Sequence, residues 1–152
     1  MNVKAGDIRE SLGEHEAIRA HMRFLARSQK NLSIQDIQAK EKIWAYRCGL
    51  HDFKEEIQFH IEVDQRIFRA LPADISFTEA EEEHGEILTL INELIELADS
   101  AVIDRLDIHE LGEYTEKIGL AVNKIFDLVE IHLTIENDIL EKALNKIKAG
   151  NY

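Results

Sequence analysis

Cysteine, proline and glycine are all scarce in this chain. Its 152 residues include one cysteine, one proline and seven glycines. A single cysteine, Cys48, cannot form a disulfide within the chain, which excludes a disulfide-stapled fold and favours a reducing, cytoplasmic location. We expect Cys48 to be a small buried residue. The shortage of proline and glycine leaves long segments without a break, and such segments favour long helices.

Clusters of basic residues and long apolar runs are also missing. The chain has 18 Lys and Arg residues against 30 Asp and Glu residues, so its formal net charge is −12. Because nucleic acids and anionic membrane surfaces are negatively charged, we expect neither as a partner. No segment approaches the roughly 18 apolar residues of a membrane span, and the first residues carry no apolar stretch for export. We therefore expect a soluble cytoplasmic protein.

What the chain does contain is helical periodicity within one domain, residues 1–152. Hydrophobic residues make up 45% of the sequence and charged residues 32%, as in ordinary globular proteins. No strand-like alternation is long enough to compete with the helical pattern. The predicted helices cover about 11–29, 34–70, 77–98 and 108–147. Short connections favour antiparallel neighbours, so the fold class is all-α, an antiparallel up-down-up-down four-helix bundle.

Local signals set the predicted helix ends. Ser11-x-x-Glu14, Ser33-x-x-Asp36 and Ser76-x-x-Glu79 are typical of helix starts, and Pro72 ends the second helix. Gly49 is a candidate position for a kink in that helix, and a loop is expected over 99–107. Trp44 and Tyr46 look exposed and could form a contact surface or pack at the bundle end.

One short sequence motif occurs twice in the chain. In the first copy Glu14-His15 is followed by His60-x-x-x-Asp64. In the second, Glu83-His84 is followed by His132-x-x-x-Glu136. Residues four apart lie on the same face of a helix, so each His–carboxylate pair points in one direction. The duplication predicts that four imidazoles and two carboxylates meet between four helices.

In each helix the histidine takes a position where the apolar stripe calls for an aliphatic residue. The stripes are Leu12, His15, Ile18, Met22 and Leu25; Phe53, Ile57, His60, Ile67 and Leu71; Phe77, Ala80, His84, Ile87, Leu88 and Ile91; and Ile125, Leu128, Val129, His132, Ile135 and Ile139. A carboxylate buried without a partner costs several kcal/mol. Metal ions satisfy all six groups together, whereas a metal-free polar core is the alternative. Nitrogen and oxygen ligands without thiolate suit iron, manganese or zinc.

These residues resemble the hemerythrin-like family, the HHE cation-binding domain, from about Glu14 to about Leu144. The family's second-helix motif corresponds to His60-x-x-x-Asp64, followed by Ile67-Phe68, and its fourth-helix motif to His132-x-x-x-Glu136. Its first- and third-helix histidines correspond to His15 and His84. The resemblance implies two iron ions, bridged by Asp64, Glu136 and an oxo or hydroxo group. It makes His15, His60, His84 and His132 the terminal ligands.

The chain also departs from the family's pattern. Asp64 replaces the usual glutamate and has a shorter reach, and Gln65 replaces a second acid. Leu88 stands where oxygen-carrying members have a further histidine, which argues against simple reversible oxygen carriage. Glu56 and Glu81, each one turn before a ligand histidine, are alternative extra ligands or outer-sphere groups.

The three other histidines are not expected to bind this metal. His51 lies on the wet side of the second helix, opposite His60, and is expected at the surface. His21 is turned away from the face of His15. His109 lies 23 residues before His132, about 35 Å along a helix.

The leading hypothesis is a non-haem di-iron protein that binds or reacts with O2, NO or peroxide, in stress response, iron-centre repair or sensing. A regulatory or interaction module with a structural metal, zinc or manganese included, is the second. A ferritin-like iron oxidase or storage protein is the third, and only Glu81-x-x-His84 fits its Glu-x-x-His motif. The sequence leaves open whether the protein is an enzyme and which protein partner it has.

Overall fold

A computed structural model describes residues 3–32, 39–103 and 106–150 of the chain. Four helices and no strand occur in these ranges: α1 (Ala5–Lys30), α2 (Ala39–Arg69), α3 (Thr78–Ile103) and α4 (Ile108–Lys148). The predicted all-α class with four helices is therefore confirmed.

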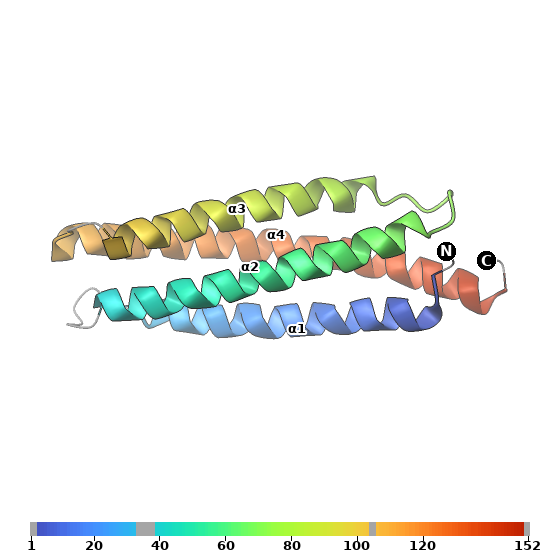
Figure 1. Ribbon diagram of the computed structural model, residues 1–152, viewed down its shortest axis with the longest axis horizontal. Helices are drawn as coiled ribbons and strands as arrows, with labels where there is room; N and C mark the ends of the chain where they lie inside the picture. The colour runs from blue at the N-terminus through green and yellow to red at the C-terminus, as the bar shows by residue number, and fades with distance from the viewer. Residues whose placement is uncertain (1–2, 33–38, 104–105, 151–152) are drawn as a thin grey trace.

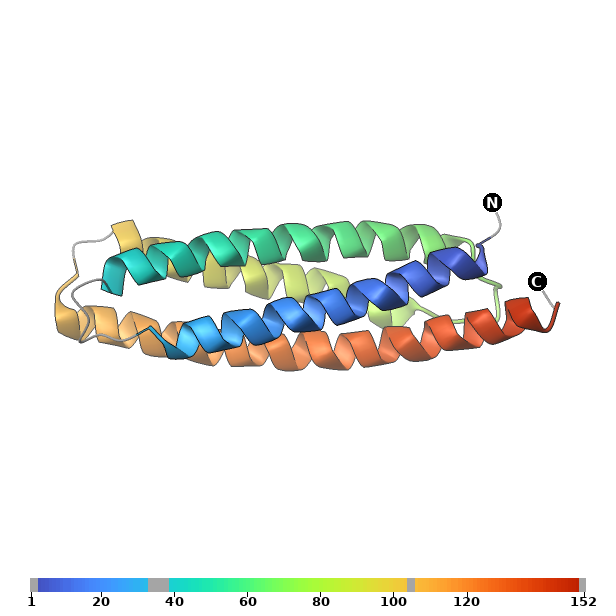
Figure 2. The ribbon, with the colours of Figure 1, turned by 90° about the horizontal axis from the view of Figure 1, so that it is seen from below.

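The four helices lie side by side along one long axis (Figures 1 and 2). α1 contacts α2 and α4, and α3 also contacts α2 and α4, so the helices form a closed ring of neighbours. Both chain ends lie at the same end of the bundle (Figure 1). This arrangement leaves one shared interior into which each helix turns its apolar stripe.

Two helix ends differ from the prediction. α1 begins at Ala5 because the Lys4 backbone nitrogen donates to the Asp7 carboxylate at 2.9 Å, which organises the first turn. Ser11 therefore lies inside the helix rather than at its start. α3 continues to Ile103, past the predicted loop boundary, because the buried Ala98 and Ala101 extend its apolar stripe.

The remaining helix ends agree with the prediction more closely. α4 starts at Ile108, where Asp107 accepts a hydrogen bond from the Glu110 backbone nitrogen at 2.8 Å. α2 is a single helix that passes through Gly49, where an added Cβ would lie 3.1 Å from Leu25 Cδ2. The signal at Ser33-x-x-Asp36 lies outside the described residues.

Two apolar clusters divide the interior. The larger runs along α1 from Ile18 and along α2 up to Ile61, and includes most of the buried residues of α3 and α4. The smaller lies nearer the chain ends and contains Ile8, Ile67 and Leu140. The predicted metal ligands lie between these clusters along their helices, so apolar side chains border the polar layer on both sides.

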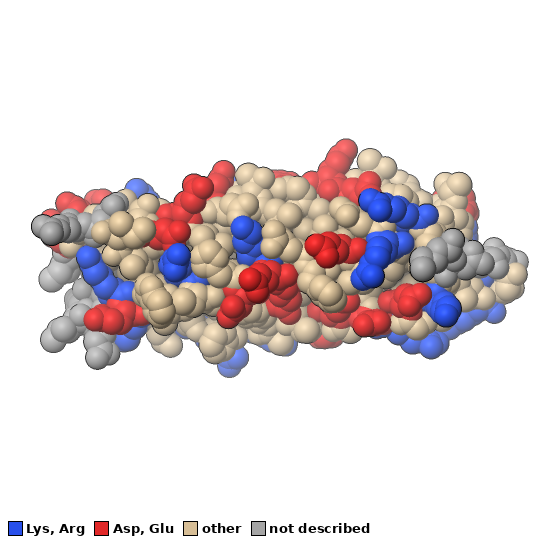
Figure 3. Space-filling view, in the orientation of Figure 1, with Lys and Arg blue, Asp and Glu red and all other residues tan. Residues whose placement is uncertain are grey.

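Carboxylates and basic groups are interspersed over the face of the bundle seen in Figure 3. None of the helices in the described ranges has the length and apolar character that crossing a bilayer requires. Cys48 is half-buried rather than fully buried.

Trp44 and Tyr46 differ in exposure. Trp44 is 54% exposed, as expected, but Tyr46 is only 4% exposed and packs in the larger apolar cluster. Of the two alternatives for Tyr46, packing is the one that the structure supports, because residues 46, 50 and 53 share the buried face of α2. Its hydroxyl has no hydrogen-bond partner among the described residues, and burial raises the pKa of Tyr46 above its ordinary value.

Replacing Tyr46 with phenylalanine is expected to stabilise the protein by about 1–3 kcal/mol, because it removes a buried hydroxyl that makes no hydrogen bond. The raised pKa favours the neutral phenol in the folded state. Below pH 10.0, the unfolded value, the phenol is neutral in both states and the shift does not change stability. Above pH 10.0 the phenol ionises in the unfolded state first, so the free energy of unfolding of the parent falls as the pH rises. Urea unfolding should thus show a gap between Tyr46→Phe and the parent that widens above pH 10.0. Tyr114→Phe, at a partly buried position, is the control; a destabilised Tyr46→Phe would contradict the prediction.

Candidate metal centre

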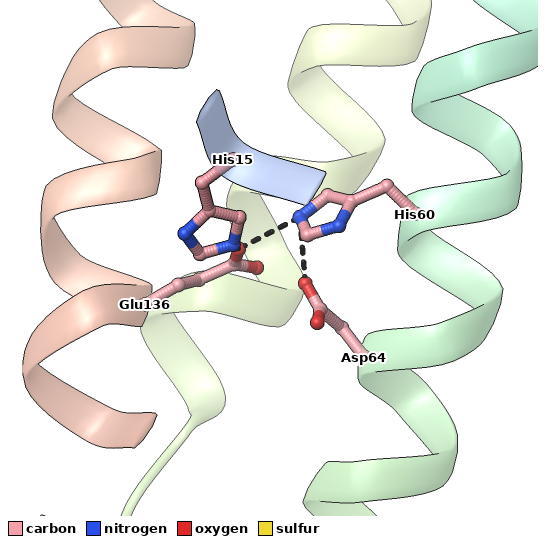
Figure 4. A group of neighbouring side chains, drawn as sticks. All are labelled: His15, His60, Asp64 and Glu136. Carbon is pink, nitrogen blue, oxygen red and sulfur yellow. Dashed lines mark hydrogen bonds and ion pairs between the residues drawn. The ribbon is translucent and has the colours of Figure 1, made fainter. Parts of the chain in front are cut away.

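All six predicted ligands meet in one buried layer of the bundle. α1 supplies His15, α3 supplies His84, and α2 and α4 each supply a His–carboxylate pair, His60 with Asp64 and His132 with Glu136. None of the six is more than 4% exposed. Figure 4 shows four of them, His15, His60, Asp64 and Glu136, pointing toward one another from three helices. The i, i+4 spacing explains why each pair shares a direction, and the stripe explains why it faces inward.

Glu136 lies at the centre of the layer. Its Oε2 atom is 3.1 Å from His15 Nε2 and 2.9 Å from His60 Nε2. Its Oε1 atom is 2.8 Å from His84 Nε2 and 2.7 Å from His132 Nε2. Each carboxylate oxygen therefore faces a different pair of histidines, which is the arrangement that a carboxylate bridging two cations needs.

Asp64 lies to one side of this centre. Its Oδ1 atom accepts a hydrogen bond from the buried Ser11 hydroxyl at 2.8 Å. Its Oδ2 atom is 2.8 Å from His60 Nε2 and 4.0 Å from His84 Nε2. The aspartate thus contacts the His60 side of the layer closely and the His84 side only at the limit of an ion pair.

Several of these atoms lie close together without forming hydrogen bonds. His15 Nε2, Asp64 Oδ2 and His132 Nε2 are buried and have no hydrogen-bond partner in the described part of the chain. Each does form an ion-pair contact, at 3.1, 2.8 and 2.7 Å, so distance alone does not exclude a hydrogen bond. Buried polar atoms are otherwise almost always satisfied. Converging but unsatisfied nitrogen and oxygen donors fit a metal ion better than they fit one another.

The donors form two groups that could each hold a cation. His15, His60, Asp64 and Glu136 offer atoms that all lie within 4.8 Å of one another, and His84, His132 and Glu136 do the same. Glu136 belongs to both. The residues present therefore fit a two-metal centre with a shared carboxylate.

Three of the four histidines have a second contact, at the ring nitrogen Nδ1 that faces away from Glu136. The Nδ1 atom of His15 donates to Asn137 Oδ1 at 2.6 Å, and that of His132 donates to Glu83 Oε1 at 3.1 Å. His60 Nδ1 lies 3.4 Å from Glu14 Oε2. Such contacts fix the ring orientation and keep Nε2 directed into the layer, where a metal ion could bind.

Sequence reasoning missed these orienting residues, as it missed Ser11. Two of these residues, Glu14 and Glu83, could have been noticed, because a glutamate directly precedes the candidate ligand histidine in both copies of the duplicated motif. Glu14 and Glu83 each contact the histidine of the next helix, rather than their own neighbour. Nothing in the spacing indicated Asn137 or Ser11, whose partners lie far away in sequence.

Replacing Glu83 with alanine is expected to lower metal affinity about 10–100-fold, because His132 loses the acceptor that orients its ring. Competition with a chromophoric chelator would measure the change. Glu82→Ala, at an exposed position on the same helix, is the control, and Glu83→Gln should recover part of the affinity because an amide oxygen still accepts. Equal affinities for Glu83→Ala and the parent would show that this contact does not orient the ligand.

The pKa shifts in the layer show how its buried carboxylates and imidazoles stabilise one another's charges. Burial raises the pKa of Glu136, but interactions with the four surrounding histidines outweigh it and hold that pKa below its usual range. Burial lowers the pKa of His60, yet Asp64 and Glu136 raise it to about 10. Burial raises the pKa of Asp64. His60 is therefore protonated at neutral pH in the metal-free centre, and a metal ion binding to its Nε2 must displace that proton.

The remaining candidate residues lie outside the centre. Glu56 pairs with His21, its Oε2 atom 2.6 Å from His21 Nδ1, and Glu81 is exposed. His109 is exposed beside Glu113. His51 is half-buried rather than at the surface, and its Nε2 atom is buried without a partner in the described ranges.

Searches of this chain against protein-family models, curated proteins and solved structures find no match.

Proposed function

We propose that the chain is a hemerythrin-like, non-haem di-iron protein built on an antiparallel up-down-up-down bundle. Its centre would bind or react with O2, NO or peroxide, in stress response, iron-centre repair or sensing. Support for the topology comes from the ring of helix contacts and from the two chain ends at one end of the bundle. Neighbouring helices in such a ring, joined by short connections, run in opposite directions.

The observation that supports a two-metal centre most strongly is the position of Glu136. One of its oxygens faces His15 and His60, and the other faces His84 and His132, with all four nitrogen–oxygen distances between 2.7 and 3.1 Å. A single-metal site would need only one side of this carboxylate. The same residues explain why the layer tolerates burial, since two cations would balance both carboxylates.

Iron supplies the redox and ligand-binding chemistry when it is bound, and the chain supplies the surroundings. The six ligands comprise four imidazoles and two carboxylates, too few donors to complete two coordination spheres. Apolar clusters on both sides of the layer limit access to water. These conditions suit a small uncharged ligand such as O2 or NO.

Metal analysis of protein purified without added metal tests the proposal. We expect two irons per chain, with charge-transfer absorption in the near ultraviolet from the ferric pair and a change in that absorption on adding NO or O2. A chain that takes up iron yet shows no response to either gas would refute the proposed ligand chemistry. One zinc per chain would instead favour a regulatory module with a structural metal.

A further inference from the structure

The two halves of the candidate centre do not have equal numbers of donors. The half formed by His15, His60, Asp64 and Glu136 has four; we call it the four-donor half. The half formed by His84, His132 and Glu136 has three, and we call it the three-donor half. Glu136 contributes one oxygen to each, so the difference comes from Asp64.

Ser11 limits Asp64 to the four-donor half. A carboxylate that bridges two cations needs one oxygen for each of them. Asp64 Oδ1 accepts a hydrogen bond from the Ser11 hydroxyl at 2.8 Å, in a contact between two side chains that are both fully buried. The other oxygen lies 2.8 Å from His60 Nε2 but 4.0 Å from His84 Nε2. The hydrogen bond from Ser11 therefore holds the Asp64 carboxylate in an orientation in which Oδ2 lies against the four-donor half and stays 4.0 Å from His84 Nε2.

The contacts at the histidine Nδ1 atoms also favour the four-donor half over the three-donor half. Both histidines of the four-donor half are held at Nδ1, His15 by Asn137 and His60 by Glu14. In the three-donor half Glu83 holds His132, but His84 Nδ1 is buried and has no partner among the residues the structure describes. An unheld imidazole loses more freedom when it binds a metal, so its contribution to affinity is smaller.

We propose that the two halves bind cations unequally. The four-donor half holds the first cation tightly, and the three-donor half holds a second, exchangeable cation with more open coordination positions. Ser11 is the positioning residue that sets this inequality. The proposal rests on the proposed function to the extent that both require metal at these residues. It departs from the expectation that Asp64 bridges the two ions as Glu136 does.

Titration with zinc(II) as a redox-inert probe, and with iron(II) under anaerobic conditions, tests the inequality. The parent should show two binding events whose dissociation constants differ by more than about tenfold, within the range that ligand-orienting contacts control. His84→Ala and His15→Ala form a matched pair of buried histidine variants. The first should lose the weak event and keep the tight one, and the second should weaken the tight one. Two equal events in the parent, or loss of the tight event in His84→Ala, would overturn the proposal.

A milder variant covers the case in which a histidine variant does not fold. Ser11→Ala removes only the hydroxyl and lets the Asp64 carboxylate turn toward the three-donor half, so the ratio of the two dissociation constants should fall about tenfold, the scale of one hydrogen bond to a charged group. Ser28→Ala, whose hydroxyl bonds the Phe24 carbonyl in the same helix, is the control and should leave the ratio unchanged. A ratio unaffected by Ser11→Ala would refute the role of Ser11.

The outcomes separate this inference from the proposed function. A folded chain that binds no metal overturns both. Two equally tight ions overturn the inequality and leave the two-metal centre standing. A single ion, lost in His15→Ala and kept in His84→Ala, overturns both the di-iron centre and the second, exchangeable cation, and leaves the four-donor half as a one-metal site.

Discussion

Replacing Glu136 with glutamine is expected to lower the affinity for both metal ions by more than about 100-fold, the upper end for residues that merely orient a ligand. The reason is that Glu136 contributes one oxygen to each half of the centre, at 2.7 to 3.1 Å from four imidazole nitrogens. Glutamine keeps the size but removes the negative charge and one acceptor atom. No other residue among the six has close contacts on both sides, so no other single substitution should affect both ions as strongly.

Metal content by elemental analysis and affinity by chelator competition would measure this effect. Glu141→Gln, at an exposed position of the same helix, is the matched control and should bind metal like the parent. Loss of a buried carboxylate beside the protonated His60 also costs about 3–5 kcal/mol of stability in the metal-free protein. Circular dichroism should therefore accompany the binding assay, so that folded protein is compared with folded protein. Unchanged stoichiometry and affinity in folded Glu136→Gln would rule out a shared carboxylate bridge.

Stripping the metal is expected to produce the largest change in stability. With free metal at about 1,000 times the dissociation constant, binding to the folded state alone adds about 4 kcal/mol to the free energy of unfolding. For a chain of this size each kcal/mol shifts Tm by about 2–4 °C, so a chelator should lower Tm by about 8–16 °C. The physical cause is that two buried carboxylates and four buried imidazoles would lose the cations that balance them, and would keep only their contacts with one another and with neighbouring side chains.

Calorimetry with and without chelator, and after adding metal back, would measure the shift. The same experiment on Glu136→Gln should show little response to chelator, because that variant holds little metal to remove. A parent protein whose Tm is the same with chelator and with metal would show that the buried layer is a metal-free polar core. That outcome would contradict the reading of these six residues as ligands.

Periodicity in the sequence was enough to predict the four helices and the inward face of each ligand. His60 and Asp64 lie four residues apart on one stripe, as do His132 and Glu136, and residues at this spacing share a face whatever surrounds the helix. The structure buries all six predicted residues in a single layer. The assignment of those residues as metal ligands stays a prediction, supported by the unsatisfied atoms of the layer.

Helix ends were predicted less well because they depend on weaker and more local forces. Ser11-x-x-Glu14 resembles a helix start, but Asp7 already organises a turn at Lys4, and Ser11 bonds Asp64 on another helix instead. For Tyr46 the sequence left exposure and packing both open, because an aromatic residue with a polar end is compatible with either side of a helix. Its burial is decided by packing in the larger apolar cluster.

The sequence by itself therefore determined that the six candidate ligands face the interior and that they recur in two matched copies, because both properties follow from the regular rise and rotation of a helix. Only the tertiary structure decided what each of those residues touches. Contacts such as Ser11 with Asp64, Glu14 with His60 and Asn137 with His15 join different helices, and they depend on how far each helix slides and turns against its neighbours. Packing of many side chains at once sets that register, and no short spacing in the chain encodes it.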